Sequence, residues 1–172
     1  MNKKIIMRPA IRSETDSQWA PFSSELELPK NSDIPLTGIG VNAPLIGDIT
    51  KVGEGTKYAA QMWLEDVNAA GGIEVGGQKY KVELIIEDNE SKAESAVKAT
   101  TKLLTEEDVL TIVGPQSSKQ AIPAGGKANE LGTPMISPWS TNPDTTKDRP
   151  FVFRGCFLDP FQGPVVANFI KD

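Results

Sequence analysis

The sequence has no histidine among its 172 residues, and this absence excludes several classes of protein function at once. Without an imidazole group there can be no Ser-His-Asp or Cys-His catalysis, no histidine-bound zinc or haem, and no imidazole pH switch. The single cysteine, Cys156, cannot form an internal disulfide, a CxxC redox pair or a thiolate metal cage. We therefore expect no cofactor, no metal site and no catalytic residues, and an enzyme is the least favoured class.

Basic clusters and long apolar runs are also missing. The 18 lysines and arginines are outnumbered by 23 aspartates and glutamates, and a net charge of −5 without a basic cluster disfavours a nucleic-acid partner. No apolar run approaches the roughly 20 residues that span a bilayer. The chain begins with basic residues, but the apolar stretch behind them ends at Arg8, too early for a signal peptide. We therefore expect no export signal within this chain.

The first 36 residues differ from the rest of the chain. Prolines and serines interrupt every short apolar group, and no helical or strand period is sustained. This pattern is typical of a disordered or loosely attached leader. The alternative is an edge strand at 25–28, where acidic and apolar residues alternate.

From residue 37 onward, strand-like and helix-like periods alternate. The helix at 54–70 carries Ala59, Met62, Trp63, Val67 and Ala70 on one face. Ser91, with Glu94 three residues on, predicts a capping box at the start of another helix. Further helices are expected at 119–131 and 161–170, and strands at 39–43, 80–86, 109–113, 135–136 and 151–153. Such alternation predicts an α/β fold with a doubly wound parallel sheet.

Polar residues follow several of the expected strands, where open parallel sheets bind their ligands. The segment 114–118 leads directly into a helix, whose free N–H groups and dipole attract an anion, and Ser118 could add a hydroxyl donor. The segment 137–142 offers hydroxyls, carbonyls and the indole of Trp139. Together they predict a site for a carboxylate beside an ammonium group, with Trp139 as an apolar wall. The alternative is that Ser118 is only a helix cap and Trp139 only a packing residue.

Three segments resemble known binding or catalytic motifs, but their sequence context does not favour those functions. The glycines of 38–43 match a dinucleotide fingerprint, but they lie before or within the strand rather than after it. The segment 53–57 lacks the spacing of a phosphate loop. The acidic group at 87–90 would suit Mg²⁺ or paired-carboxylate catalysis, but a solvated loop before a capping box explains it more simply.

Six segments of the chain carry a resemblance to a known family. They are GVNAPLIG (40–47), EDVNAAGGI (65–73), IVGPQSS (112–118), PMISPWST (134–141), FR (153–154) and DPFQG (159–163). In this order they resemble the branched-chain amino acid substrate-binding proteins of ABC transporters, which are type I periplasmic binding proteins. The resemblance covers about residues 38–172 and implies two α/β lobes that close around an amino acid, outside the cytoplasm, and deliver it to a membrane permease.

The resemblance also implies roles for individual residues. Ser118 would bind the ligand carboxylate through its hydroxyl and N–H groups, and Thr141 would contact both the carboxylate and the ammonium group. The carbonyl of Trp139 would accept from the ammonium group, with Ser140 between the two. The first loop would flank the side-chain pocket through Pro44, Leu45 and Ile46.

Family members are longer than this chain, and the segment 151–163 resembles their first crossover between lobes. We therefore expect residues 37–160 to form a partial N-terminal lobe and 161–172 to begin the second lobe. One lobe alone should bind weakly, and an incomplete sheet should promote self-association through its exposed edge and apolar face. The alternatives are a cytoplasmic small-molecule sensor or regulatory subunit built on the same lobe, and a truncated gene product without a function.

Overall fold

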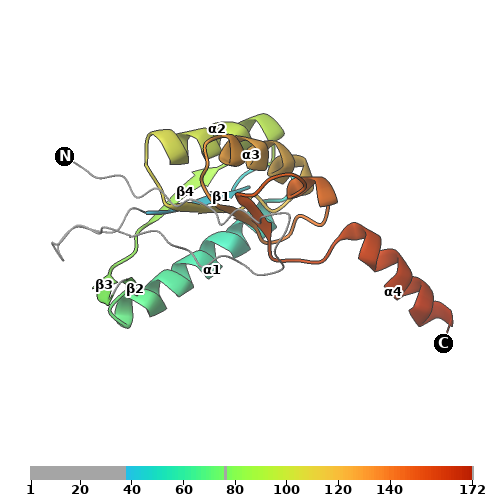
Figure 1. Ribbon diagram of the computed structural model, residues 1–172, viewed down its shortest axis with the longest axis horizontal. Helices are drawn as coiled ribbons and strands as arrows, with labels where there is room; N and C mark the ends of the chain where they lie inside the picture. Colours follow the sequence, from blue (N-terminus) through green and yellow to red (C-terminus); the bar gives the residue numbers. More distant parts are fainter. Residues whose placement is uncertain (1–37, 76, 172) are drawn as a thin grey trace, which may run out of the picture.

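A computed structural model describes residues 38–75 and 77–171 of the chain (Figure 1). The expected leader and its alternative strand at 25–28 lie outside these residues. In chain order the elements are β1 (Ile39–Ala43), α1 (Thr50–Ala69), β2 (Ile73–Val75), β3 (Gln78–Tyr80), β4 (Leu84–Asp88), α2 (Ala93–Thr105), β5 (Thr111–Val113), α3 (Ser118–Glu130), β6 (Met135–Ser137), the 3-10 helix η1 (Pro143–Thr145), β7 (Val152–Arg154) and α4 (Asp159–Lys171).

The described strands form a parallel sheet in the order β4-β1-β5-β6-β7 and a separate hairpin of β2 and β3. Because parallel neighbours need a crossover connection, helices come to lie on the faces of the sheet. Figure 1 shows α1 on one face and α2 with α3 on the other. The predicted doubly wound parallel sheet is thereby confirmed.

The core lies between the sheet and the α2–α3 layer. Small residues on α3 let this helix pack closely, and a Cβ added to Gly125 would lie 3.1 Å from Cε of Met135. Burying these side chains supplies most of the apolar stabilisation of this layer. The cluster comprises Ala96, Leu103, Leu104, Val109, Ile112, Ala124, Ala128, Met135 and Val152.

Among the described elements, α1 covers the opposite face of the sheet, where it crosses β1 and β4. Side chains alternate along a strand, so Ile136 and Phe153 point away from the α2–α3 core that holds their neighbours Met135 and Val152. Ile136 and Phe153 are paired across β6 and β7 and are 39% and 51% exposed. Beyond α1, this face therefore presents apolar side chains to solvent.

The apolar side of α1 is also more exposed than its pattern suggests. Met62 is 66% exposed and Trp63 41%, whereas Gly53 in the first turns is buried. A helical period predicts which residues share a face, but another layer must pack on that face to bury it. In the described part of the chain, no element covers the outer side of α1 (Figure 1).

The strand expected at 80–86 is divided in the structure. β3 ends at Tyr80 and pairs with β2, and β4 starts at Leu84 and pairs with β1. Between them the N–H and the carbonyl of Val82 bond to the side-chain amide of Asn68, each at 2.9 Å. The period of two continues through this break, so the pattern cannot show that the backbone leaves one sheet for the other.

The capping box predicted at Ser91 is wrong. Helix α2 begins at Ala93, and its N-cap is Lys92. The Ser91 hydroxyl donates to the carbonyl of Ile46 at 2.9 Å and accepts from the N–H of Ile49 at 3.3 Å. A hydroxyl engaged by the loop after β1 is not available to cap the helix.

Helix α4 stands apart from the sheet. It begins at Asp159, and every one of its residues is exposed. Figure 1 shows it projecting away from the rest of the described chain. That residues 161–172 start a second lobe stays a prediction. No helix in the described ranges combines the length and the apolar character needed to cross a membrane.

Candidate functional site

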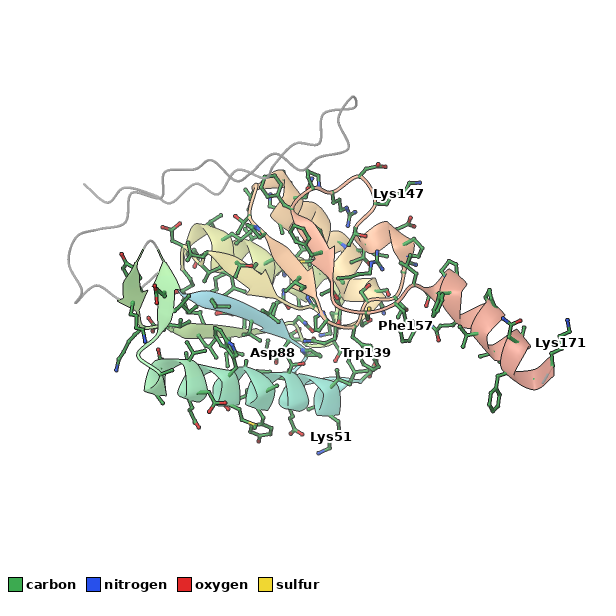
Figure 2. All side chains as sticks on the ribbon, turned by 60° about the horizontal axis from the view of Figure 1, so that its bottom comes forward. Lys51, Asp88, Trp139, Lys147, Phe157 and Lys171 are labelled. Atoms are coloured by element: carbon green, nitrogen blue, oxygen red, sulfur yellow. The ribbon has the colours of Figure 1, made fainter. Side chains whose placement is uncertain are left out.

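The expected site residues lie in loops that leave the carboxyl ends of the parallel strands. Pro44, Leu45 and Ile46 follow β1, Ser118 opens α3 after β5, and the segment 139–141 follows β6. Figure 2 labels Asp88, at the end of β4, and Trp139 along this edge of the sheet. Parallel strands bring their carboxyl ends to one edge, which is why segments far apart in sequence meet there.

Ser118 is the first residue of α3, and Ser117 rather than Ser118 is its N-cap residue. The N–H groups of Ser118 and Lys119 have no acceptor among the described residues, as is usual for the first turn of a helix. These groups carry the partial positive charge of the helix N-terminus. Beside them, the Ser118 hydroxyl accepts a hydrogen bond from the hydroxyl of Ser140 at 2.9 Å. The first turn of α3 can therefore receive an anion.

Ser140 lies behind this site rather than at its surface. It is fully buried, and its hydroxyl lies 2.9 Å from Oγ of Ser118 and 2.6 Å from Oγ1 of Thr145. Its N–H donates to Oγ of Ser137 at 3.2 Å, and the Ser137 hydroxyl in turn donates to the carbonyl of Pro115 at 2.6 Å. Direct contact between Ser140 and a ligand stays a prediction, but its hydroxyl joins α3 to the loop after β6.

Trp139 and Thr141 flank Ser140 and are more accessible. The Trp139 side chain is 55% exposed, and Thr141 is half-buried. Within residues 38–75 and 77–171, neither the N–H nor the hydroxyl of Thr141 has a partner, and the carbonyl of Trp139 accepts no hydrogen bond. The Thr141 carbonyl, in contrast, accepts from the N–H of Asp159 at 2.9 Å. Donors for an anion and an acceptor for a cation therefore lie within three consecutive residues.

The loop after β1 is held by Asp88, a role that the sequence does not predict. Its Oδ1 accepts from the N–H groups of Leu45 at 2.8 Å, Ile46 at 3.4 Å and Glu90 at 2.8 Å. Pro44 is buried, whereas Ile46 is exposed. An aspartate at the carboxyl end of a strand is a signal for this kind of backbone anchoring, because its carboxylate can accept several N–H bonds. The acidic group at 87–90 thus has structural partners.

Arg154 anchors the loop after β6 in a similar way. Its Nη1 donates to the carbonyls of Ser140 at 3.0 Å and Asn142 at 2.9 Å, and its Nη2 donates to the carbonyl of Pro143 at 3.1 Å. The thiol of Cys156 also donates to the Ser140 carbonyl, at 3.3 Å. The planar fork of an arginine suits several carbonyls at once. Arg154 lies in one of the segments that resemble the family, but the carbonyls of Ser140 and Asn142 are 14 and 12 positions earlier in the chain, and no local pattern indicates them.

Ion pairs shift the pKa values of two groups in and beside helix α2, Glu90 and Lys102. The Lys92 ammonium group and the Ser95 hydroxyl donate to the Glu90 carboxylate and hold its pKa below the ordinary 4.5. The Glu87 carboxylate, 2.6 Å from the Lys102 ammonium group, raises the pKa of Lys102 above its ordinary value. Both shifts come from surface pairs. Among the described residues, no cluster of three or more potential ligand side chains could hold a metal ion.

The described part of the chain matches a known family along most of its length. The family model for periplasmic binding proteins matches residues 37–171. An amino acid binding protein of Pseudomonas aeruginosa is 35% identical over 133 residues, which are 77% of this chain and 34% of that protein. A leucine-, isoleucine-, valine-, threonine- and alanine-binding protein of the same species is 31% identical, over 78% of this chain and 35% of that protein.

Solved structures show the same likeness. The branched-chain amino acid transporter substrate-binding protein LivJ of Streptococcus pneumoniae, in complex with isoleucine, is 34% identical with a TM-score of 0.72, over 78% of this chain and 38% of LivJ. The leucine-binding protein LivK of Thermotoga maritima is 32% identical with a TM-score of 0.66, over 78% of this chain and 36% of LivK. The chain thus spans about a third of the length of the relatives it matches. With its parallel sheet, its polar carboxyl edge and a family model matched over residues 37–171, this chain belongs to the periplasmic binding protein family.

Proposed function

We propose that this chain is part of the substrate-binding component of an ABC transporter, and that its ligand is an amino acid with a branched aliphatic side chain. The observation that carries the proposal is a group of polar atoms at the carboxyl edge that have no partner within residues 38–75 and 77–171. These are the donors of Ser118 and Thr141 and the carbonyl of Trp139. A zwitterion presents a carboxylate and an ammonium group on one carbon, and such an edge offers a partner to each.

Each residue then has a distinct role in binding. The N–H and hydroxyl groups of Ser118 and the N–H of Thr141 bind the carboxylate, because charge-assisted hydrogen bonds are the stronger ones. The Trp139 carbonyl and the Thr141 hydroxyl accept from the ammonium group. Pro44, Leu45 and Ile46 form the wall beside the aliphatic side chain. No bond is made or broken, so the protein acts by binding and not as an enzyme.

The ligand is delivered to a membrane permease after two lobes close around it, in the periplasm or another extracytoplasmic space. The names of the relatives support the ligand class and a part in transport, since two are binding proteins for leucine or similar amino acids and LivJ is the substrate-binding protein of a branched-chain amino acid transporter. The described residues form one layered unit with the site on its open edge. A ligand bound to one such edge keeps much of its contact with water, so we expect weak binding by this chain.

A titration of the 172-residue chain tests the proposal. We expect L-leucine, L-isoleucine and L-valine to shift the backbone amide resonances of Ser118 and Thr141 in NMR spectra, with Kd in the millimolar range, about −4 kcal/mol. Glycerol and D-glucose, which lack the zwitterion, serve as matched controls and should leave these resonances in place. If the three amino acids shift nothing at this edge, or shift it no more than glucose does, the proposed function is wrong.

The partly covered sheet supports a second element of the proposal, self-association of the chain. Ile136 and Phe153 expose adjoining apolar surface on β6 and β7. Removing such surface from water favours contact with another apolar face. We propose that copies of this chain associate through this face.

A further inference from the structure

Three hydroxyl groups form a line that runs from the interior to the candidate site. Oγ1 of Thr145 lies 2.6 Å from Oγ of Ser140, and the Ser140 hydroxyl donates to Oγ of Ser118 at 2.9 Å. Thr145 and Ser140 are both fully buried, and Ser118 is half-buried at the first turn of α3. The three residues come from η1, the loop after β6 and the start of α3, so only the tertiary fold places them in line.

The direction of this line follows from counting hydrogens. A hydroxyl group has one hydrogen to donate and two lone pairs to accept with. Ser140 gives its hydrogen to Ser118, so it has none left for Thr145. The contact between Ser140 and Thr145 must therefore have Thr145 as its donor. Each hydroxyl donates toward the site, from Thr145 to Ser140 and from Ser140 to Ser118.

At the end of the line, the Ser118 hydroxyl accepts from Ser140 and donates to no group in the described part of the chain, so its own hydrogen is available to a ligand. Hydrogen bonds in a chain polarise one another, by about 10–30% per bond in the condensed phase, so the last hydroxyl becomes a better donor. The first turn of α3 already favours negative charge at this point. The Ser118 hydroxyl is thus prepared to donate to an anionic acceptor.

The backbone that carries Ser140 and Thr145 is itself held in place by hydrogen bonds from neighbouring strands. Arg154 donates to the carbonyls of Ser140 and Asn142, at 3.0 and 2.9 Å, and also bonds to the hydroxyl oxygen of Thr146. Ser137 holds the N–H of Ser140 at 3.2 Å. Residues on both sides of Thr145 are therefore fixed to β6 and β7, and the hydroxyls need no rearrangement to reach their places.

We propose that Thr145 and Ser140 are positioning residues that fix Ser118 as a hydrogen-bond donor, so that the site selects ligands with a free carboxylate over analogues in which that group is neutral. This inference rests on the proposed amino-acid binding and adds to it the residues behind the site. Without the Thr145 hydroxyl, Ser140 could either donate to Ser118 or accept from it, and Ser118 would no longer be held as a donor.

The test compares two ligands on four forms of the full 172-residue chain. L-Leucine and L-leucinamide differ only in the group that faces Ser118. In Thr145→Val, an isosteric change that removes the first hydroxyl, we expect affinity for leucine to fall about three- to tenfold, the size of a neutral hydrogen bond. The logarithm of Kd for leucinamide should change by less than half as much as the logarithm of Kd for leucine. Thr145→Ser restores a hydroxyl and should restore the ratio of the two affinities.

Thr111→Val is the matched control. The Thr111 hydroxyl donates to the carbonyl of Pro134 at 2.9 Å on β5, outside the line, so this change should leave the ratio as it is. Two results would show a merely structural role and overturn the inference. One is an equal loss of affinity for both ligands in Thr145→Val, and the other is an affinity ratio that Thr145→Ser does not restore.

A second measurement needs no ligand. In NMR spectra of the free wild-type chain, the hydroxyl protons of Thr145 and Ser140 should exchange slowly with water. The Ser140 proton should also show a cross-peak to the β-protons of Ser118. Fast exchange of both protons, or a Ser118 proton directed at Ser140, overturns the inference even if Thr145→Val fails to fold. If the wild-type chain binds neither ligand, the proposed function and the selectivity built on it both fail, whereas the hydroxyl protons still report the direction of the line.

Discussion

The carboxylate of Asp88 accepts a hydrogen bond from the backbone N–H of Leu45 at 2.8 Å and so joins the end of β4 to the loop after β1. The same Oδ1 atom also accepts from Ile46 and Glu90. One side chain thus satisfies backbone donors in two loops of the candidate site. Since three donors depend on one oxygen, the shape of the first loop depends on Asp88.

Replacing Asp88 by alanine should loosen this loop. We expect Asp88→Ala to lower the free energy of unfolding by about 1–3 kcal/mol, because the partly buried N–H groups of Leu45 and Glu90 lose their acceptor. Hydrogen exchange at Leu45 and Ile46 should become faster. Asp48→Ala, an exposed aspartate in the same loop, is the control and should change neither quantity. Equal effects of the two variants would contradict the role of Asp88.

Two glycines in α1 should respond in opposite ways to alanine. A Cβ on Gly53 would overlap the carbonyl oxygen of Pro44, whereas a Cβ on Gly55 would meet nothing within 4 Å. We expect Gly53→Ala to destabilise the chain by about 1–3 kcal/mol through overpacking. Gly55→Ala should stabilise it by about 1 kcal/mol, since alanine is the better helix former. Urea denaturation of both variants measures this, and a loss of stability in Gly55→Ala would show that α1 is not formed there.

The buried amide of Asn42 should be among the most sensitive positions in the chain. Its Nδ2 donates to the carbonyl of Ala96 at 2.9 Å and to Oγ1 of Thr100 at 3.0 Å, and its Oδ1 accepts from Nδ2 of Asn89 at 2.8 Å. Asn42→Leu leaves these buried groups without partners, so we expect a loss of about 2–5 kcal/mol in unfolding free energy.

Thr100→Val is the companion variant to Asn42→Leu, because it removes one contact of the same network. We expect it to cost about 1 kcal/mol, clearly less than Asn42→Leu. Thermal unfolding of the two variants side by side gives the comparison. If Thr100→Val proved as costly as Asn42→Leu, the amide network would not be what holds β1 to α2.

The two neighbouring serines at the start of α3 separate ligand binding from helix stability. Ser118→Ala removes a hydroxyl that donates to the carboxylate, and we expect affinity for L-leucine to fall about 10- to 100-fold, as for hydrogen bonds to charged groups. Ser117, the N-cap, makes no side-chain capping bond within the described chain, so Ser117→Ala should have little effect on binding. Calorimetric or NMR titration of both variants decides; similar losses in the two would remove Ser118 from the site.

The exposed sheet face predicts association that one substitution can weaken. Phe153→Ser removes a large apolar side chain from β7, and light scattering at high concentration should show less self-association than in the wild type. Leu131→Ser changes a residue of similar exposure to Ile136 at the end of α3, away from this face, and should not alter the scattering. A wild-type chain that stays monomeric at all concentrations would refute the proposed association.

Much of the fold could be predicted because the signals are local. The strand at 39–43 and the helices near 119–131 and 161–170 agree with β1, α3 and α4 to within two residues at each end. Periodicity, turns and glycine stops are properties of neighbouring residues, and their alternation is enough to indicate a parallel sheet. Because ligands bind beyond the carboxyl ends of parallel strands, the same pattern predicts a site in the loops around Ser118 and Thr141.

Two of the predictions that differ from the structure, the cap at Ser91 and the strand at 80–86, share a cause in long-range hydrogen bonds. Ser91 has the sequence of a helix cap, but its hydroxyl bonds to Ile46, 45 positions earlier in the chain. The run from Tyr80 to Ile86 has the period of one strand, but Asn68 takes the backbone groups of Val82 and divides it. A local pattern cannot show which distant group competes for the same donor or acceptor.

The sequence by itself therefore determined the class of the fold, the loops that carry the candidate site and, through the missing histidine, that these 172 residues supply no imidazole group. The tertiary structure decided how the site is supported. It placed Ser140 inward, with its hydroxyl between Ser118 and Thr145, and it joined Arg154 to the loop that carries Thr141. It also left Ile136 and Phe153 partly exposed on one face of the sheet. These features depend on groups brought together from different strands, and the free energy of their contacts exists only once the sheet has formed.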